Sequence, residues 1–501
     1  MFTSLQAVDG QPISNGHSDT SLSYEGETPM TDSDQQKKSG SKRYVMLVTI
    51  VAALGGLLFG YDTAVIAGAI GFLQSHFNLD PVMKGWAASS ALLGCVIGVS
   101  FAGVFSDTMG RKKTLVLSGV LFLLSAIGTA TPNAFYLFVI FRMLGGVGVG
   151  VASMASPMYI AEISPGKVRG RMVSVNQLAI VTGMLIIYFV NYFIALGSDE
   201  AWNVATGWRW MFASGALPSA AFLALLSFVP ESPRWLVEKG KKEKANQILS
   251  RVGGKEFAEG EIRSIESSLD QEVETLGQLF RTGWRKVMVL GIALAILQQV
   301  TGINVFLYYA PEIFKKLGAG VDAALLQTVV VGAVNLAFTI VAIWTVDRLG
   351  RKPLMMIGAT GMGISLVAMG LAAQFQVVSI WVLLCILTYI ACFALSVGPV
   401  TWVLLSEIYP TRIRGRALSV ATFCLWAANF VVSQTFPMMD ENASLIARFN
   451  HGFPFYVYAA FCLILLLTVW RGVPETKGRS LEEIEKHWNA ERKLENRNTK
   501  S

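Results

Sequence analysis

Charged side chains are scarce in this chain. Asp, Glu, Lys and Arg make up only 15% of its 501 residues, whereas 53% of the residues are hydrophobic. A soluble domain of average composition carries about 25% charged residues. The apolar residues also come in long blocks, so the composition excludes a soluble globular enzyme of this length and favours a membrane protein.

Residues that bind metals or perform covalent catalysis are also few. The five cysteines lie inside apolar segments, without metal-ligand spacing, so we interpret them as packing residues rather than a disulfide or zinc framework. They are Cys95, Cys385, Cys392, Cys424 and Cys462. The four histidines, His17, His76, His451 and His487, do not fall deep in an apolar segment. Because no nucleophile–base pattern is evident either, we expect no enzyme activity, no metal and no cofactor.

The apolar blocks predict twelve membrane-spanning helices. A hydrocarbon core about 30 Å thick requires roughly 20 apolar residues per helix. Twelve segments meet this requirement, beginning near residues 45, 85, 114, 135, 172, 208, 285, 323, 354, 379, 416 and 453. The sequence therefore predicts an all-α protein embedded in the lipid bilayer.

The net charge of +7 could indicate a nucleic-acid partner, but the basic residues follow a membrane topology instead. Clusters such as Arg111–Lys113 and Lys239–Lys244 follow even-numbered spans, whereas connections after odd-numbered spans carry few basic residues, such as Lys84. Cytoplasmic connections are enriched in Lys and Arg. We therefore expect a multi-pass protein of the cell membrane, with both termini in the cytoplasm and no nucleic-acid partner.

Three short motifs recur at nearly one spacing. Asp107–Lys112 is echoed by Asp347–Lys352 at an offset of 240, and Glu162–Arg171 by Glu407–Arg416 at an offset of 245. Pro230–Arg234 is echoed more loosely by Pro474–Gly478 at an offset of 244. A common offset predicts two six-helix halves of the same orientation, an arrangement found in one class of transporters.

The repeat also divides the chain. We expect a disordered cytoplasmic N-terminal tail over residues 1–43, because this stretch is polar and rich in Ser, Gly, Asp and Gln. The first six-helix half should cover 44–230 and the second 285–472, with a cytoplasmic C-terminal tail over 473–501. Between the halves, the charged linker 231–284 should form short helices, because Glu238–Arg251 has a helical pattern.

Several of these motifs resemble those of the sugar porter family of the major facilitator superfamily, over residues 44–485. They are the two Asp…Gly-Arg-Lys loops, Pro230-Glu-Ser-Pro-Arg234, Gln298-Gln299-Val-Thr-Gly-Ile-Asn304, Gly398-Pro-Val-Thr-Trp402 and Pro474-Glu-Thr-Lys-Gly478. Within the family the chain looks most similar to the bacterial xylose–proton and other monosaccharide–proton symporters. The resemblance implies a major facilitator fold with two pseudo-symmetric halves that works by alternating access.

Two charged residues lie inside apolar spans of the first half. An Asp or Arg at the centre of a membrane helix costs roughly 2.5–3.5 kcal/mol on insertion scales. Pairing would lower that cost, so Asp62 and Arg142 are expected to meet. The pair is either a permanent structural contact or a proton carrier, and the resemblance implies proton coupling. At an offset of 242, Asp62 corresponds to the neutral Asn304, so we expect the first half to handle the proton and the second to bind the sugar.

Amide and aromatic side chains in apolar spans suit a neutral sugar. Carboxamides donate and accept hydrogen bonds from one side chain, and aromatic rings stack on the apolar faces of a sugar ring. The resemblance maps sugar binding onto Phe59, Gln177, Gln298, Gln299, Asn304, Tyr308, Asn335, Trp402 and Trp426. The alternative is that the amides only join helices. One position departs from the family pattern, because Leu425 stands where an amide is expected, which leaves the choice of sugar open.

The repeated loop motifs are expected to form a cytoplasmic gate. Their charged residues are Asp107, Arg111, Glu162 and Arg169 in the first half and Asp347, Arg351, Glu407 and Arg414 in the second. Single exposed pairs are weak, so we expect a network that joins the two halves and breaks when the gate opens.

The function expected from these features is proton-coupled symport of a neutral monosaccharide, a hexose or a pentose, by a chain that is functional as a monomer. A passive uniporter is the alternative. A sugar sensor that does not transport is disfavoured, because such sensors carry long cytoplasmic extensions and only about 30 residues follow the last span here.

Overall fold

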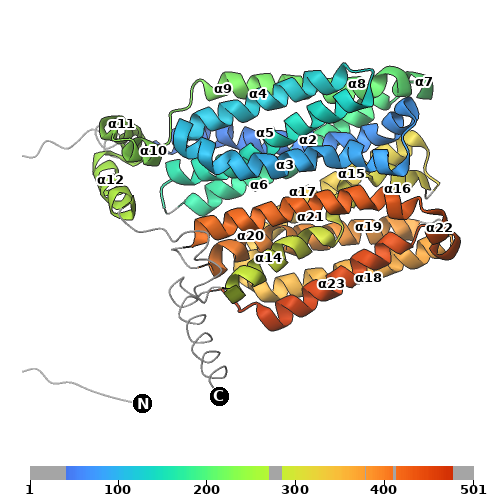
Figure 1. The fold of residues 1–501 in the computed structure, drawn as a ribbon. Coiled ribbons are helices and arrows are strands. Elements are labelled where there is room, and N and C mark those ends of the chain that lie inside the picture. Colours follow the sequence, from blue (N-terminus) through green and yellow to red (C-terminus); the bar gives the residue numbers. More distant parts are fainter. Residues whose placement is uncertain are drawn as a thin grey trace, which may run out of the picture. The chain divides into compact units, whose positions relative to one another are not determined.

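The computed structural model describes residues 41–166, 168–269, 285–316, 318–377, 380–409 and 413–477. The expected tails over 1–43 and 473–501 thus lie mostly outside the described residues, as does the end of the linker. Among the described residues the regular elements are all helices (Figure 1), and twelve helical segments are long and apolar enough to cross a membrane. The prediction of an all-α protein with twelve spans is confirmed.

The first six spans occupy residues 42–226. They are α2 (Lys42–Phe77), α3 (Pro81–Met109), α4 (Arg111–Ala130), α5 (Phe135–Ile163), α6 (Arg169–Ala195) and a sixth span built from α7 (Glu200–Trp202), the π-helix η1 (Asn203–Gly207), α8 (Trp208–Ala213) and α9 (Ala216–Leu226). We call them the first half.

The last six spans follow the same order and form the second half. They are α14 (Arg285–Val300) with α15 (Ile303–Tyr308), α17 (Val321–Leu349), α18 (Arg351–Gln374), α19 (Ile380–Cys392) with the π-helix η2 (Phe393–Val397) and α20 (Gly398–Ile408), α21 (Arg414–Asp440) and α23 (Phe453–Gly472). The short helices α16 (Ala310–Lys316) and α22 (Ala443–Phe449) lie between spans.

Three short helices follow the first half. They are α10 (Pro233–Glu238), α11 (Lys242–Gly253) and α12 (Lys255–Leu269). The helix expected over Glu238–Arg251 is therefore interrupted at its start, because Gly240 takes a left-handed φ of 72°. The apolar side chains of Trp235, Leu236 and Ile265 pack together in a small core of their own.

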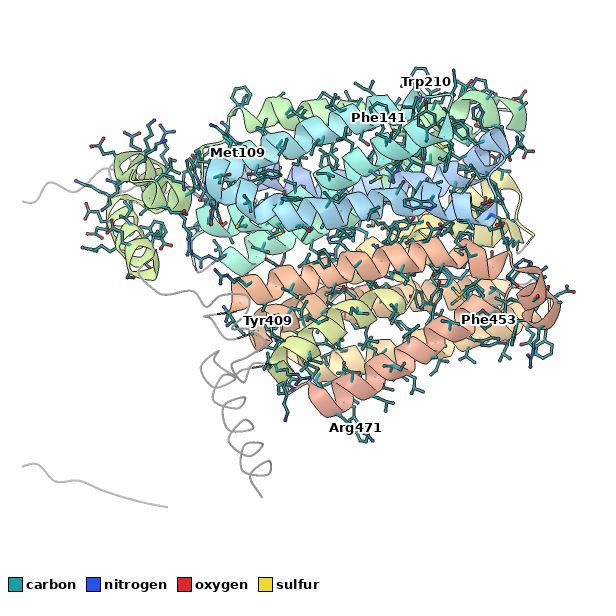
Figure 2. All side chains as sticks on the ribbon, viewed as in Figure 1. Met109, Phe141, Trp210, Tyr409, Phe453 and Arg471 are labelled. Atoms are coloured by element: carbon teal, nitrogen blue, oxygen red, sulfur yellow. The ribbon has the colours of Figure 1, made fainter. Side chains whose placement is uncertain are left out.

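The linker helices mark one end of the helical bundle, which we call the linker end. The opposite end, near α7, α16 and α22, is the far end (Figure 1). Figure 2 shows Met109 and Tyr409 at the linker end, and Trp210 and Phe453 toward the far end. The two halves meet where α3 packs against α21 and α6 packs against α17.

Large apolar side chains cover the outer surface of the helices. Leu217 of α9, Phe228 and Trp344 of α17 are 80%, 84% and 71% exposed. Soluble monomers rarely expose wide apolar patches, whereas a helix that faces lipid requires them. The apolar surface is therefore the face that the bilayer covers, and polar groups inside the bundle need a separate explanation.

Candidate functional site

An ion pair is buried inside the first half. Arg142 of α5 donates from Nη1 to the carboxylate of Asp62 in α2 at 3.2 Å, and to the Asp62 backbone carbonyl at 3.1 Å. The Arg142 side chain is 1% exposed and the Asp62 side chain 14%. The guanidinium is therefore enclosed by protein, whereas part of the Asp62 side chain stays accessible.

The surroundings hold the pair together. The Arg142 guanidinium lies 5.4 Å from the centroid of the Phe212 ring, and its Nε has no hydrogen-bond partner in the part of the chain that is described. A small cavity lined in part by Tyr61 and Ser219 adjoins Asp62. Removing one partner of a buried ion pair typically costs about 3–5 kcal/mol, because the other charge is left uncompensated. Neutralising Asp62 would thus weaken its attraction for Arg142, which would keep hydrogen bonds to residue 62 but no ion pair.

The seventh span is broken in the second half. Gly302 lies between α14 and α15 with a φ of 93°, and a Cβ there would stand 2.6 Å from the ring of Tyr458. The break frees backbone groups, and the Tyr389 hydroxyl donates to the Thr301 carbonyl at 2.9 Å. Discontinuous helices form the substrate sites of several transporter folds, so this break is a candidate site.

Three amides form a hydrogen-bonded chain at the break. Asn304 Nδ2 donates to Gln299 Oε1 at 2.5 Å, and Gln299 Nε2 donates to Gln298 Oε1 at 3.3 Å. Gln298 Nε2 in turn donates to the Gly398 carbonyl of α20 at 2.9 Å. Each link uses only part of an amide's two N–H donors and two oxygen lone pairs, so capacity remains for the hydroxyls of a polyol.

Two aromatic rings, one from each half, are in contact. The rings of Phe59 in α2 and Trp426 in α21 lie 5.5 Å apart between centroids. Trp426 is buried, and its Nε1–H has no partner among the described residues. A buried donor left without a partner costs about 1–3 kcal/mol. The indole N–H is thus available to a ligand hydroxyl.

One polar residue in this region was missed in the sequence analysis. Asn429 of α21 is buried, and its Oδ1 accepts from the Ser433 hydroxyl at 3.2 Å. Asn429 follows Trp426 by three residues and so lies on the same side of the helix. The available signal was an amide within an apolar span, the same signal that selected Asn335.

The other expected sugar residues lie on separate helices. Asn335 of α17 is buried, Gln177 of α6 is half-buried, and Trp402 of α20 is 39% exposed. Trp402 follows Gly398 by one turn, on the helix whose first carbonyl receives the Gln298 amide. No hydrogen bond described here joins Gln177 or Asn335 to the amide chain, so their part in a site remains a prediction.

The loop motifs at the linker end make matching contacts in both halves. Arg111 bonds Glu162 at 2.9 Å, and its echo Arg351 bonds Glu407 at 2.9 Å. Glu231 accepts from the Lys112 backbone N–H at 3.0 Å, and its echo Glu475 accepts from the backbone N–H groups of Arg351 and Lys352, each at 3.0 Å. The repeat seen in the sequence is therefore a repeat of contacts.

A charge network that joins the two halves stays a prediction. Each ion pair described between motif residues joins partners of the same half, rather than the two halves. Asp107 supports Arg111 from the preceding turn at 3.3 Å, Arg169 reaches Glu261 of the linker helix α12 at 3.7 Å, and Arg414 donates to the Tyr409 carbonyl. The side chain of Asp347 lies outside what the structure describes.

Glu475 shows how firmly one motif is held. Partial burial acts to raise the pKa of its carboxyl group, but backbone N–H groups of Lys477, Arg351, Lys352 and Thr476 outweigh it and hold that pKa below its usual value. A carboxylate bound by several backbone amides remains ionised. The motif therefore fixes the start of α18 to the end of α23.

Comparisons with known proteins agree with this geometry. The family described as "Sugar (and other) transporter" matches residues 48–488. The chain is 48% identical to the D-xylose–proton symporter of Escherichia coli over 476 residues, covering 90% of this chain and 97% of the symporter. It is 40% identical to the glucose facilitated diffusion protein of Zymomonas mobilis over 469 residues, covering 90% and 99%.

A solved structure matches as well. The xylose transporter of Escherichia coli in a partially occluded, inward-open conformation superposes with a TM-score of 0.79 at 45% identity. The match covers 88% of this chain and all of that one. These relatives are transporters, and one couples its sugar to a proton while another is passive.

Proposed function

The chain belongs to the sugar transporter family of the major facilitator superfamily, and we propose that it carries a neutral monosaccharide across the membrane together with a proton. It is a multi-pass membrane protein. Of the two relatives named above, the proton-coupled symporter is more similar to this chain, at 48% identity, than the facilitated diffusion protein, at 40%.

The observation that carries the proposal is a link between the ion pair and the aromatic contact. Phe59 and Asp62 lie three residues apart on one face of α2. Phe59 meets Trp426 of the second half, while Asp62 holds Arg142 of the first. A shift of α2 that follows protonation would therefore reach the sugar site through one rigid helix, as coupling requires.

The two halves divide the chemistry. Asp62 is the proton carrier, because its carboxylate is partly accessible and its partner is a permanent cation. The chain Asn304–Gln299–Gln298, with Trp426 and Phe59, binds the sugar, because amides match the mixed donors and acceptors of hydroxyl groups. Gln177, Tyr308, Asn335 and Trp402 complete the proposed site as the two halves close around the substrate.

Alternating access requires two arrangements of the halves, and the protonation state of Asp62 would decide which one is favoured. With Asp62 ionised, Arg142 is bound to it and α2 and α5 are held together. Protonation neutralises the carboxylate and lets Arg142 turn to other acceptors, so the proton changes which packing of the half is favoured. The motif residues Arg111, Glu162, Arg351 and Glu407 keep each half rigid at the linker end while the halves rock.

Concentrative uptake tests the function. Purified protein in vesicles with an inward proton gradient should accumulate labelled pentose or hexose above the external concentration, and a protonophore should abolish accumulation but spare counterflow. Counterflow against a panel of sugars identifies the substrate. Uptake that only equilibrates, whatever the gradient, would establish the passive uniporter instead.

The linker end is proposed to face the cytoplasm, with both termini, and the monomer is proposed as the functional unit. Gly260 is exposed on α12 and Ala447 is exposed on α22 at the far end. In intact cells, and in a background without the native cysteines, Ala447→Cys should react with an impermeant maleimide and Gly260→Cys should react only after lysis. The reverse pattern would invert the topology.

A further inference from the structure

A buried lysine joins the two halves at the far end. Lys84 lies in the first turn of α3, where its side chain is 4% exposed. Its Nζ is 3.3 Å from Glu312 of α16 and 3.0 Å from Glu441, which follows α21. Both carboxylates belong to the second half, so one ammonium from the first half holds two acids of the other.

We infer that Lys84 is a positioning residue of the transport cycle, whose contacts with Glu312 and Glu441 hold the far end shut. The inference rests on the proposed alternating access. A buried cation between two carboxylates is stable only while it stays with them, because separation leaves the Lys84 ammonium without either acid and Glu441 without this cation. Opening the far end must therefore break this contact.

The helices beside Lys84 are built for a close approach. Gln434 of α21 receives a bond from the Ser89 hydroxyl at 2.7 Å and donates to the Val82 carbonyl at 3.0 Å. Next to Lys84, a Cβ on Gly85 would lie 2.6 Å from the Gln434 carbonyl oxygen. Thus α3 contacts α21 through Val82, Gly85 and Ser89, and Lys84 lies among these residues.

Glu312 is held from both sides. Besides Lys84, Glu312 accepts from Lys315 at 3.1 Å. The Oε1 atom of Glu312 also lies so close to Gly71 of α2 that a Cβ on Gly71 would stand 2.4 Å from it. Burial acts to raise the pKa of Glu312, but Lys315 and Lys84 outweigh it and hold that pKa below its usual value. The acid is therefore ionised when it meets Lys84.

The repeat argues that this contact is a separate device. At offsets of 240 to 242, Lys84 corresponds to Ala324, Leu325 and Leu326, and Glu312 corresponds at 242 to Ile70. Lys84 and Glu312 thus have no charged counterpart in the other half, whereas Glu441 corresponds at 242 to Asp199. Because this contact is present at the far end and is not repeated by the pseudo-symmetry, it stabilises the state in which the far end is closed over the state in which it is open.

Removing the ammonium should open the far end. Lys84→Met removes the cation described at Glu441 and leaves Glu312 only Lys315 of its own half, so no ion pair holds either acid to the first half. The ratio of far-end-open to far-end-closed protein should therefore rise at least tenfold. Spin labels at the exposed residues Tyr136 and Ala443, one in each half and in a background without native cysteines, report this as a longer distance. Lys84→Arg keeps the charge and should resemble the parent.

Transport should change in a way that a general loss of stability does not produce. Apparent affinity for external sugar is reduced by the fraction of protein that is not binding-competent. A larger outward-open fraction therefore lowers KM for uptake in Lys84→Met, while kcat falls because the return step is disfavoured. A variant that is merely unstable would lose kcat with KM unchanged.

Two further variants keep the test decisive. Lys316→Met removes the same charge from a pair with Asp440 that lies wholly within the second half, so its distance should stay that of the parent. Exchanging the charges, Lys84→Glu with Glu441→Lys, should restore part of the closed population. The inference is overturned if Lys84→Met leaves the distance unchanged, or if Lys316→Met moves it equally. The distance requires no sugar, so it stands even if the uptake experiment rejects the proposed cargo.

Discussion

Asp62→Asn should abolish concentrative uptake while sparing exchange of sugar across the membrane. For one proton per sugar, a gradient of one pH unit can sustain about tenfold accumulation, since it is worth about 1.4 kcal/mol. An amide cannot carry the proton, so the accumulation ratio should fall to about one. Binding and counterflow should continue, because an amide still accepts a hydrogen bond from Arg142, and Asn304 occupies the matching place of the second half.

The control is the same chemical change on an exposed acid. Asp322→Asn, in the first turn of α17 at the far end, should leave the accumulation ratio unaltered. Accumulation by Asp62→Asn with the pH dependence of the parent would remove Asp62 from the proton path. Loss of binding as well as accumulation would instead assign the Asp62–Arg142 pair a structural role.

Features set by composition and repeated spacing could be predicted from the sequence. Twelve apolar segments require twelve helices, because backbone polar groups in a bilayer must bond within their own segment. The contact of Asp62 with Arg142 could be anticipated for a similar reason, since two isolated charges at membrane depth have few other partners. The equivalence of Glu231 and Glu475 also followed, because the repeat preserves both the motif and the helix start that it binds.

Features set by distant partners could not be predicted. In the sequence, Lys84 was one of a few basic residues outside the positive clusters. Its burial depends on Glu312 and Glu441, which lie more than 200 positions away in the sequence. The motif charges are predicted to join the halves, and that network stays a prediction. The ion pair described for Arg111 is with Glu162 of its own half.

The amide site illustrates the same limit on a smaller scale. Gln298, Gln299 and Asn304 were expected to bind sugar, and the structure adds that they bond one another in a line that ends on the Gly398 carbonyl. Spacing alone did not reveal this, because the helix is interrupted between Gln299 and Asn304, where Gly302 takes a φ of 93°. The position of each amide in this hydrogen-bonded chain predicts how much its loss should weaken sugar binding.

Gln299→Ala should therefore weaken sugar binding more than Gln298→Ala or Asn304→Ala. Gln299 is the middle member, so its loss leaves Asn304 Nδ2 without an acceptor and Gln298 Oε1 without a donor. An unpaired buried polar group costs about 1–3 kcal/mol, which corresponds to about 5- to 150-fold in affinity. We expect all three variants within this range and Gln299→Ala at its upper end, measured by titration of the purified protein with the sugar that counterflow identifies.

Gln374→Ala removes an amide that bonds Tyr456 toward the far end, so it should leave affinity as in the parent. Equal affinity in all three variants and the parent would exclude the amide chain from the sugar site, whereas equal losses would mean that each amide contacts the sugar independently of its neighbours.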